Sequence, residues 1–131
     1  MNAAYMAGFI DADGSFGIYR HNELTVQIAQ VDRGVLEQIV KAYGGRIVTL
    51  REAKENQQKI YQWYLSRRDQ VKTLVEDISP HLIVKKDQAE VVIEFINTYT
   101  TPFGRDKGTG MKYKKRRRHE LAMRLKELKR K

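Results

Sequence analysis

The stretch MAGFIDADG, residues 6–14, decides the fold of this chain. Within it and one turn before it, small residues recur at the spacing of a helical turn, at Ala4, Gly8 and Ala12. Residues spaced in this way lie on one face of a helix, and small side chains there let a second helix approach closely. The larger apolar residues between them can point into a core. The sequence therefore predicts a helix over residues 3–13 with a contact face on one side.

Two acids and a glycine end this helix: Asp11, Asp13 and Gly14. Glycine is favoured just past the end of a helix. Acids are disfavoured there, because the helix dipole is negative at its carboxyl end. Two carboxylates in this place suggest that a cation lies nearby. An Asp-x-Asp-Gly sequence alone is more often a surface turn. The whole nine-residue stretch is far more specific, and the interpretation depends on it.

Length and composition favour a single intracellular domain. The chain has 131 residues, enough to bury one core, and it has no cysteine. The lack of cysteine excludes a disulfide framework and a thiolate metal site. No apolar run reaches the length of a membrane span, and the first residues lack the order of a signal peptide. We therefore expect no membrane partner and an intracellular location.

The basic charge is concentrated in residues 111–131. The chain has 25 Lys and Arg against 16 Asp and Glu, a formal charge of +9, and this segment alone holds 11 basic and 2 acidic residues. A concentrated basic segment attracts polyanions, so its first part is expected to contact DNA phosphates. Two alternatives stay open: a solvated or disordered tail, and a helix docked on the core through its leucines. The expected phosphate contacts are Lys112, Lys114, Lys115, Arg116, Arg117 and Arg118, and the leucines are Leu121, Leu125 and Leu128.

Hydrophobic periodicity and turn residues predict the remaining elements. Alternation predicts strands, and the three-to-four spacing predicts helices, one of them capped by Asp32. The predicted class is α+β, in the order αββαββα plus a C-terminal basic helix, with an antiparallel sheet covered by helices on one face. The strands are expected at 15–20, 24–28, 46–52 and 59–66, and the later helices at 69–78 and 86–98. The domain is expected over 1–99, followed by a linker over 100–110 and the basic helix over 111–131.

The uncovered face of this sheet is expected to be polar and aromatic. Such a face commonly meets only water. Glutamine and arginine side chains, however, can also make paired hydrogen bonds to base edges in the major groove of DNA. This face is expected to carry Tyr19, His21, Thr25, Gln27, Thr49, Arg51, Gln62 and Tyr64.

Residues 6–14 resemble the LAGLIDADG motif, with Met6 and Phe9 in place of its two leucines and the other residues matching. The chain is therefore similar to the LAGLIDADG homing endonuclease family over about residues 3–99. The resemblance implies a site-specific endonuclease that hydrolyses double-stranded DNA at a long pseudo-palindromic site, with its sheet in the major groove. Two other functions fit the same fold: an RNA-binding intron maturase and a non-catalytic DNA-binding regulator.

The motif occurs once in the chain, and one helix with a small-residue face needs a partner. In the family, single-motif chains are homodimers whose motif helices pack against each other. The resemblance therefore implies a homodimer with Ala4, Gly8 and Ala12 at its interface.

The resemblance also implies the metal site and its neighbours. Phosphodiester hydrolysis is assisted by paired divalent ions, and Mg²⁺ prefers hard oxygen ligands. By the motif match, Asp13 supplies the carboxylate and Ala12 a carbonyl oxygen to Mg²⁺, with Mn²⁺ expected to substitute. Residues 80–89 resemble the family segment whose lysine organises the attacking water, which makes Lys85 that lysine. Gln30, just past the second strand, is the expected assisting polar residue, whereas Asp11 is expected to orient the helix end.

Overall fold

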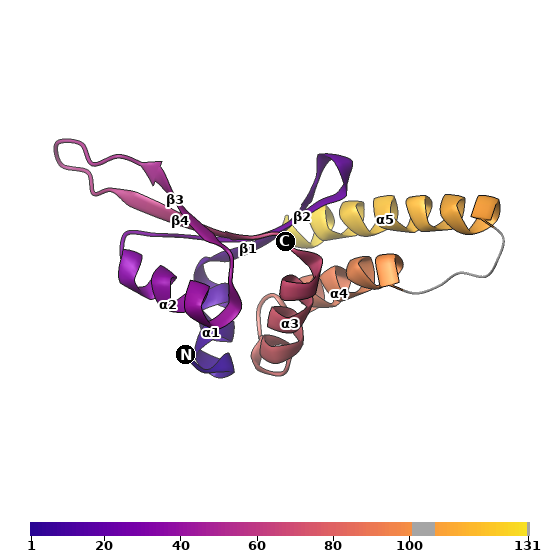
Figure 1. The fold of residues 1–131 in the computed structure, drawn as a ribbon, viewed down its shortest axis with the longest axis horizontal. Helices are drawn as coiled ribbons and strands as arrows, with labels where there is room; N and C mark the ends of the chain where they lie inside the picture. Colours follow the sequence, from indigo (N-terminus) through magenta and orange to yellow (C-terminus); the bar gives the residue numbers. More distant parts are fainter. Residues whose placement is uncertain (101–106, 131) are drawn as a thin grey trace.

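The computed structural model describes residues 1–100 and 107–130, without the side chains of residues 100 and 107–112. Four antiparallel strands form one sheet in the order β1-β2-β4-β3, and the predicted α+β class is confirmed (Figure 1). Among the described residues, no helix is both long enough and apolar enough to cross a membrane. The elements are α1 (Ala3–Asp13), β1 (Gly14–Tyr19), η1 (Arg20–Asn22), β2 (Glu23–Gln30), α2 (Arg33–Tyr43), β3 (Arg46–Arg51), β4 (Ile60–Leu65), α3 (Arg68–Ile78), η2 (Ser79–His81), α4 (Lys86–Thr100) and α5 (Lys107–Lys129).

Helix α1 forms as its sequence predicts. The side chain of Asn2 accepts a hydrogen bond from the backbone of Tyr5 at 2.7 Å and so caps the first turn. The helix passes directly into β1 at Gly14, whose φ of −85° is ordinary extended backbone. Glycine is needed there for space, because a Cβ would come within 2.9 Å of the backbone of Ile10. The close approach of helix and strand, rather than a left-handed turn, explains this glycine.

The sheet buries one face under helices α1 to α4 and leaves the other uncovered (Figure 1). Trp63 lies at the centre of the buried face, and its indole donates to the carbonyl oxygen of Gly44 at 2.8 Å. This bond fastens the end of α2 to the sheet. We call the other side the open face; by register it carries Tyr19, Thr25, Gln27, Arg46, Val48, Arg51, Gln62 and Tyr64.

An irregularity in β3 corrects the predicted membership of the open face. Register shifts between Thr49 and Arg51, so these two residues do not share a face as alternation requires. Thr49 pairs with Tyr61, whose ring packs against the core, and Thr49 therefore lies on the helix side. Arg46 pairs with Tyr64 and lies on the open face instead. The prediction that Thr49 belongs to the open face is wrong, because a bulge reverses alternation beyond it.

Three helices follow β4, so the order is αββαββααα. Helix α5 begins at Lys107, within the stretch predicted as a linker, and lies beside α4 and β1 (Figure 1). Leu121 and Leu125 are 3% and 1% exposed and belong to the main core. Of the alternatives left open by the sequence, the structure has the docked helix. The basic helix therefore follows residues 1–99 in sequence but packs on the same core.

Leu125→Ala is expected to lower the free energy of unfolding by about 2–5 kcal/mol, because it removes a buried side chain and leaves a cavity. Urea unfolding of the two proteins measures this difference. The matched change Leu50→Ala, at a side chain that is 53% exposed, is expected to cost less than about 0.5 kcal/mol. Equal stability of Leu125→Ala and the unchanged protein would show that α5 does not dock in solution.

Candidate functional site

The end of α1 and the start of α4 are held together by a reciprocal pair of contacts. The carboxylate of Asp11 accepts from the backbone N–H groups of Ile83 at 2.8 Å and Lys85 at 2.9 Å. The ammonium of Lys85 donates to the carbonyl oxygen of Asp11 at 2.7 Å. An anion thus lies before the first turn of α4 and a cation at the last turn of α1, as both helix dipoles favour. The Lys85 ammonium thus contacts a backbone carbonyl of this turn, and the Asp11 carboxylate joins the end of α1 to the segment before α4.

Three of the predicted metal-binding and catalytic residues lie near the end of α1, where this helix passes into β1. Asp13 and Ala12 are exposed at the last turn of α1, one and two residues from Asp11. Gln30 is the last residue of β2, not a residue beyond it, and its side chain accepts from the backbone of Val31 at 3.0 Å. Gly14 pairs with Ile28, which places Gln30 near the junction of α1 and β1.

The small-residue face of α1 is uncovered in the single chain. Ala4, Gly8 and Ala12 are all exposed, and a Cβ at Gly8 would have no atom within 4 Å. Ile83 and Val84, next to the Asp11 contacts, are 86% and 72% exposed. Exposed apolar side chains gathered beside such a face are typical of an interaction surface. Ile83 and Val84 could not be identified from the sequence, because a pair of apolar residues in a short loop has no periodicity.

One chain alone does not enclose a metal ion. Among the described residues, no three His, Cys, Asp or Glu side chains gather as a metal cluster. Mg²⁺, however, is often bound through one or two carboxylates, with water and substrate phosphate completing its shell. The exposed carboxylate of Asp13 and the carbonyl oxygen of Ala12, at a helix end where carbonyls lack helical partners, are hard donors of this kind. These two donors fit Mg²⁺ provided that ligands from outside the described residues complete its shell.

The open face carries a chain of hydrogen bonds that crosses three strands. The hydroxyl of Tyr64 donates to Gln62 Oε1 at 2.8 Å. Gln62 Nε2 donates to Gln27 Oε1 at 3.1 Å, and Gln27 Nε2 donates to the hydroxyl of Tyr19 at 3.4 Å. Gln62 is only 8% exposed, so it supports its neighbours rather than facing solvent.

A hollow of about 620 Å³ on this side of the sheet gathers five of the predicted residues. Arg46 and Arg68 also line it, and the sequence prediction missed both. Arg46 is the first residue of β3 and pairs with Tyr64 of the open face, whereas Arg68 lies beyond the strand in the first turn of α3. Arg51 lies apart, where it donates to the carbonyl oxygen of Gln58 in the β3–β4 loop. The five predicted residues are Tyr19, His21, Thr25, Gln27 and Tyr64.

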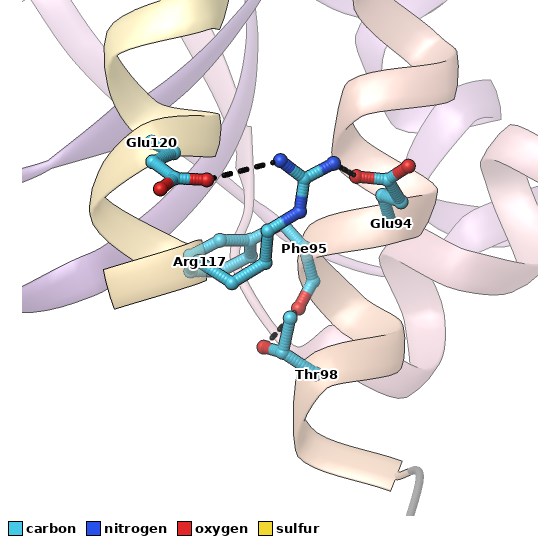
Figure 2. A network of polar contacts seen from close by, with 5 residues as sticks. All are labelled: Glu94, Phe95, Thr98, Arg117 and Glu120. Atoms are coloured by element: carbon cyan, nitrogen blue, oxygen red, sulfur yellow. Dashed lines mark hydrogen bonds and ion pairs between the residues drawn. The ribbon is translucent and has the colours of Figure 1, made fainter. Parts of the chain in front are cut away.

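Two of the six basic residues predicted to contact phosphate are engaged with α4. Figure 2 shows the guanidinium of Arg117 between Glu94 of α4 and Glu120 of α5. Its hydrogen bond to Glu120, together with Glu94, raises the pKa of Arg117 above its usual range. Arg118 donates to Thr98 at 2.8 Å and lies 3.6 Å from the ring centre of Tyr99. These two arginines fasten α5 to α4, which corrects their predicted role as phosphate ligands.

The other basic residues of α5 divide by position. Lys115 and Arg116 are exposed, Lys114 is half-buried, and the side chain of Lys112 lies outside the described residues. At the other end of α5, the ammonium of Lys129 lies 5.9 Å from the ring centre of Tyr19. Burial lowers the pKa of Lys129. Positive charge is therefore presented in the middle of α5 and in its last turn, where Lys129 lies beside Tyr19 at the edge of the hollow.

Asp11→Ala is expected to lower the free energy of unfolding by about 1.5–3 kcal/mol, because each hydrogen bond to its carboxylate is charge-assisted. Urea unfolding measures the change. Asp69→Ala is the matched control: Asp69 forms an exposed ion pair with Arg67, so its loss is expected to cost less than about 1 kcal/mol. If the two variants lose equal free energy of unfolding, the link between α1 and α4 stabilises the fold no more than an exposed ion pair does.

The model of the LAGLIDADG-like domain matches residues 1–79. Among solved structures, the homing endonuclease I-CvuI in complex with a DNA target aligns with a TM-score of 0.74 and 22% identity, covering 96% of this chain and 80% of that chain. The archaeal intron-encoded homing endonuclease I-Vdi141I, complexed with DNA, aligns with a TM-score of 0.70 and 24% identity, covering 96% and 82%. At such identities the similarity concerns the fold.

I-SmaMI, bound to an uncleaved DNA target in the presence of calcium ions, aligns with a TM-score of 0.70 and 18% identity. The alignment covers 95% of this chain but 45% of that chain. No curated protein sequence matches. Because the family model covers more than half of the 131 residues, this chain belongs to the family of LAGLIDADG-like domains.

Proposed function

We propose that this chain is a site-specific DNA endonuclease that acts as a homodimer and uses a divalent metal ion. One observation carries the proposal: Asp13 presents an exposed carboxylate in the last turn of α1, and the Lys85 ammonium contacts the carbonyl oxygen of Asp11 in that same turn, on a helix whose small-residue face is uncovered. A protein that only bound DNA would gain nothing from a carboxylate directed at phosphate.

The open face supports DNA as the substrate. It offers hydroxyl, amide and guanidinium groups, which are the groups that hydrogen-bond to base edges in the major groove. The similar structures of I-CvuI, I-Vdi141I and I-SmaMI were solved with DNA. The exposed basic residues Lys115 and Arg116 are proposed to contact phosphates. The side chains proposed to contact bases are Thr25, Gln27, Tyr19 and Tyr64. His21 and Arg51 are proposed as further contacts at the two ends of the sheet.

Dimerisation through α1 is supported by shape and by length. Ala4, Gly8 and Ala12 leave room for a second helix, and Ile83 and Val84 would be covered by the same contact. This chain also corresponds to less than half of I-SmaMI, so a second copy would supply a comparable second unit. A two-fold dimer would then recognise a pseudo-palindromic site.

The chemistry follows from what each side chain can hold. In the dimer, the Asp13 carboxylate and Ala12 carbonyl of each protomer would hold Mg²⁺, for which Mn²⁺ is expected to substitute. When bound, such an ion supplies an activated water and neutralises charge on the phosphate. The Lys85 ammonium is placed to hold water and to offset negative charge that develops beside Asp13. Gln30 can donate to or accept from the same water through its amide.

Digestion of a randomised duplex library tests this function. The purified protein is incubated with the library and Mg²⁺, and the new ends are sequenced. A single enriched pseudo-palindromic site, absent when EDTA replaces Mg²⁺, is expected. Specific binding without new ends would favour a DNA-binding regulator. A protein that retains structured RNA and leaves every duplex intact would favour an intron maturase.

A further inference from the structure

The hydrogen bonds on the open face all run in one direction. Tyr64 donates to Gln62, Gln62 to Gln27, and Gln27 to Tyr19. A tyrosine hydroxyl can donate or accept, so a chain that ends in two tyrosines could run either way. With Tyr64 as donor, the carbonyl of Gln27 faces β4 and its amino group faces β1.

Gln27 keeps hydrogen-bonding capacity that its neighbours do not use. Its amino group has two protons and donates one to Tyr19, and its carbonyl has two lone pairs and accepts one bond from Gln62. One donor therefore remains on the β1 side and one acceptor on the β4 side. Gln27 is half-buried, whereas Gln62 is 8% exposed and has no comparable access to a base.

We infer that Gln62 is a positioning residue that fixes which way the amide of Gln27 faces, and so determines which orientation of an A·T base pair the sheet accepts. This inference rests on the proposed function. A glutamine amide recognises adenine by donating to N7 and accepting from N6. The transposed pair, T·A, presents these groups in the opposite order across the major groove. An amide that faces one way fits A·T, and an amide turned over fits T·A.

Gln62→Glu reverses the two hydrogen bonds between residue 62 and Tyr19 and is the sharpest test. An ionised carboxylate only accepts, so Gln27 must then donate to it and turn its amide over, while Tyr64 still donates. At the one base pair that Gln27 contacts, the preference is expected to change from one orientation to its transpose. The discrimination is expected to be roughly 5- to 150-fold each way. Competition binding measures it, at mildly alkaline pH, with every base pair of the site varied in turn.

Two further variants test the same inference without placing a carboxylate at the nearly buried position 62. Gln62→Leu conserves bulk and removes both hydrogen bonds, so discrimination between A·T and T·A should fall to near unity at that pair only. Tyr64→Phe removes the hydroxyl that donates to Gln62 and keeps the ring, whose centre lies 5.5 Å from Cζ of Arg46. The ratio of affinities for A·T and T·A at that pair should therefore decrease. Gln38→Glu adds the same charge at an exposed position of α2 and should change nothing.

Thermal melts establish which variants are folded before binding is compared. If folded Gln62→Leu and Tyr64→Phe keep the original preference at every position, or weaken at all positions alike, Gln62 does not act through Gln27. If Gln62→Glu does not fold, the other two variants decide. An unchanged protein with no sequence preference would instead overturn the proposed function, which separates the two failures.

Discussion

Asp13→Asn is expected to abolish DNA cleavage while sequence-specific binding persists. An amide is a poor ligand for a hard cation, and loss of metal-ion stabilisation worth several kcal/mol lowers the rate by about 10³-fold or more. The change also removes one negative charge per protomer that faces phosphate, so affinity should stay equal or rise. A cleavage time course with Mg²⁺, run beside a gel-shift titration, measures both effects.

Asp69→Asn is the matched control for this experiment. It makes the same chemical change at an exposed residue of α3 whose partner is Arg67, and it should leave cleavage intact. Asp13→Asn that cuts at the normal rate would remove Asp13 from the metal site. Loss of both cutting and binding would show instead that the variant disturbs the fold.

Gly8→Leu is expected to convert the dimer to a folded monomer without cleavage activity. In the single chain nothing lies within 4 Å of a Cβ at this position, so leucine should fit, and it favours helix over glycine by up to about 1 kcal/mol. At a helix–helix contact, however, the same side chain would hold the two backbones apart. Light scattering at micromolar concentration, a melting curve and a cleavage assay measure association, stability and activity separately.

Ala42→Leu provides the comparison, since it adds similar bulk at an exposed position of α2. This variant should remain dimeric and active. A stable dimer in Gly8→Leu would mean that α1 is not the interface. A Gly8→Leu protein that melts well below the unchanged chain would mean that α1 is packed differently within the monomer.

Local sequence signals predicted those elements that depend on interactions between residues near in sequence. Asn2 and Asp32 cap their helices through side-chain oxygens, and both caps are present in the structure. Alternation placed β1 and β2 correctly because neither strand has a bulge. The same rule failed in β3, where the irregularity between Thr49 and Arg51 exchanges the two faces. A bulge depends on how two strands meet, and the sequence of one strand does not show it.

The basic helix shows a different limit. Charge density alone predicted that Arg117 and Arg118 contact phosphate, yet their partners Glu94 and Thr98 come from α4, 23 and 20 residues earlier. Leu121 and Leu125 gave the better signal, since an apolar stripe on a basic helix needs a surface to cover. The contact of Lys85 with the turn that carries Asp13 could be expected only from the family resemblance, because it joins residues 74 apart in sequence.

The link between Asp11 and Lys85 would make activity depend on the completion of folding, if Lys85 acts as proposed. Its hydrogen bonds join residues 72 and 74 apart in sequence, so they form only after the sheet and the intervening helices are in place. A partly synthesised or locally opened chain would have Asp13 without its lysine, and would lack an organised centre. For the proposed DNA endonuclease, cleavage activity would then be restricted to molecules that have completed their fold.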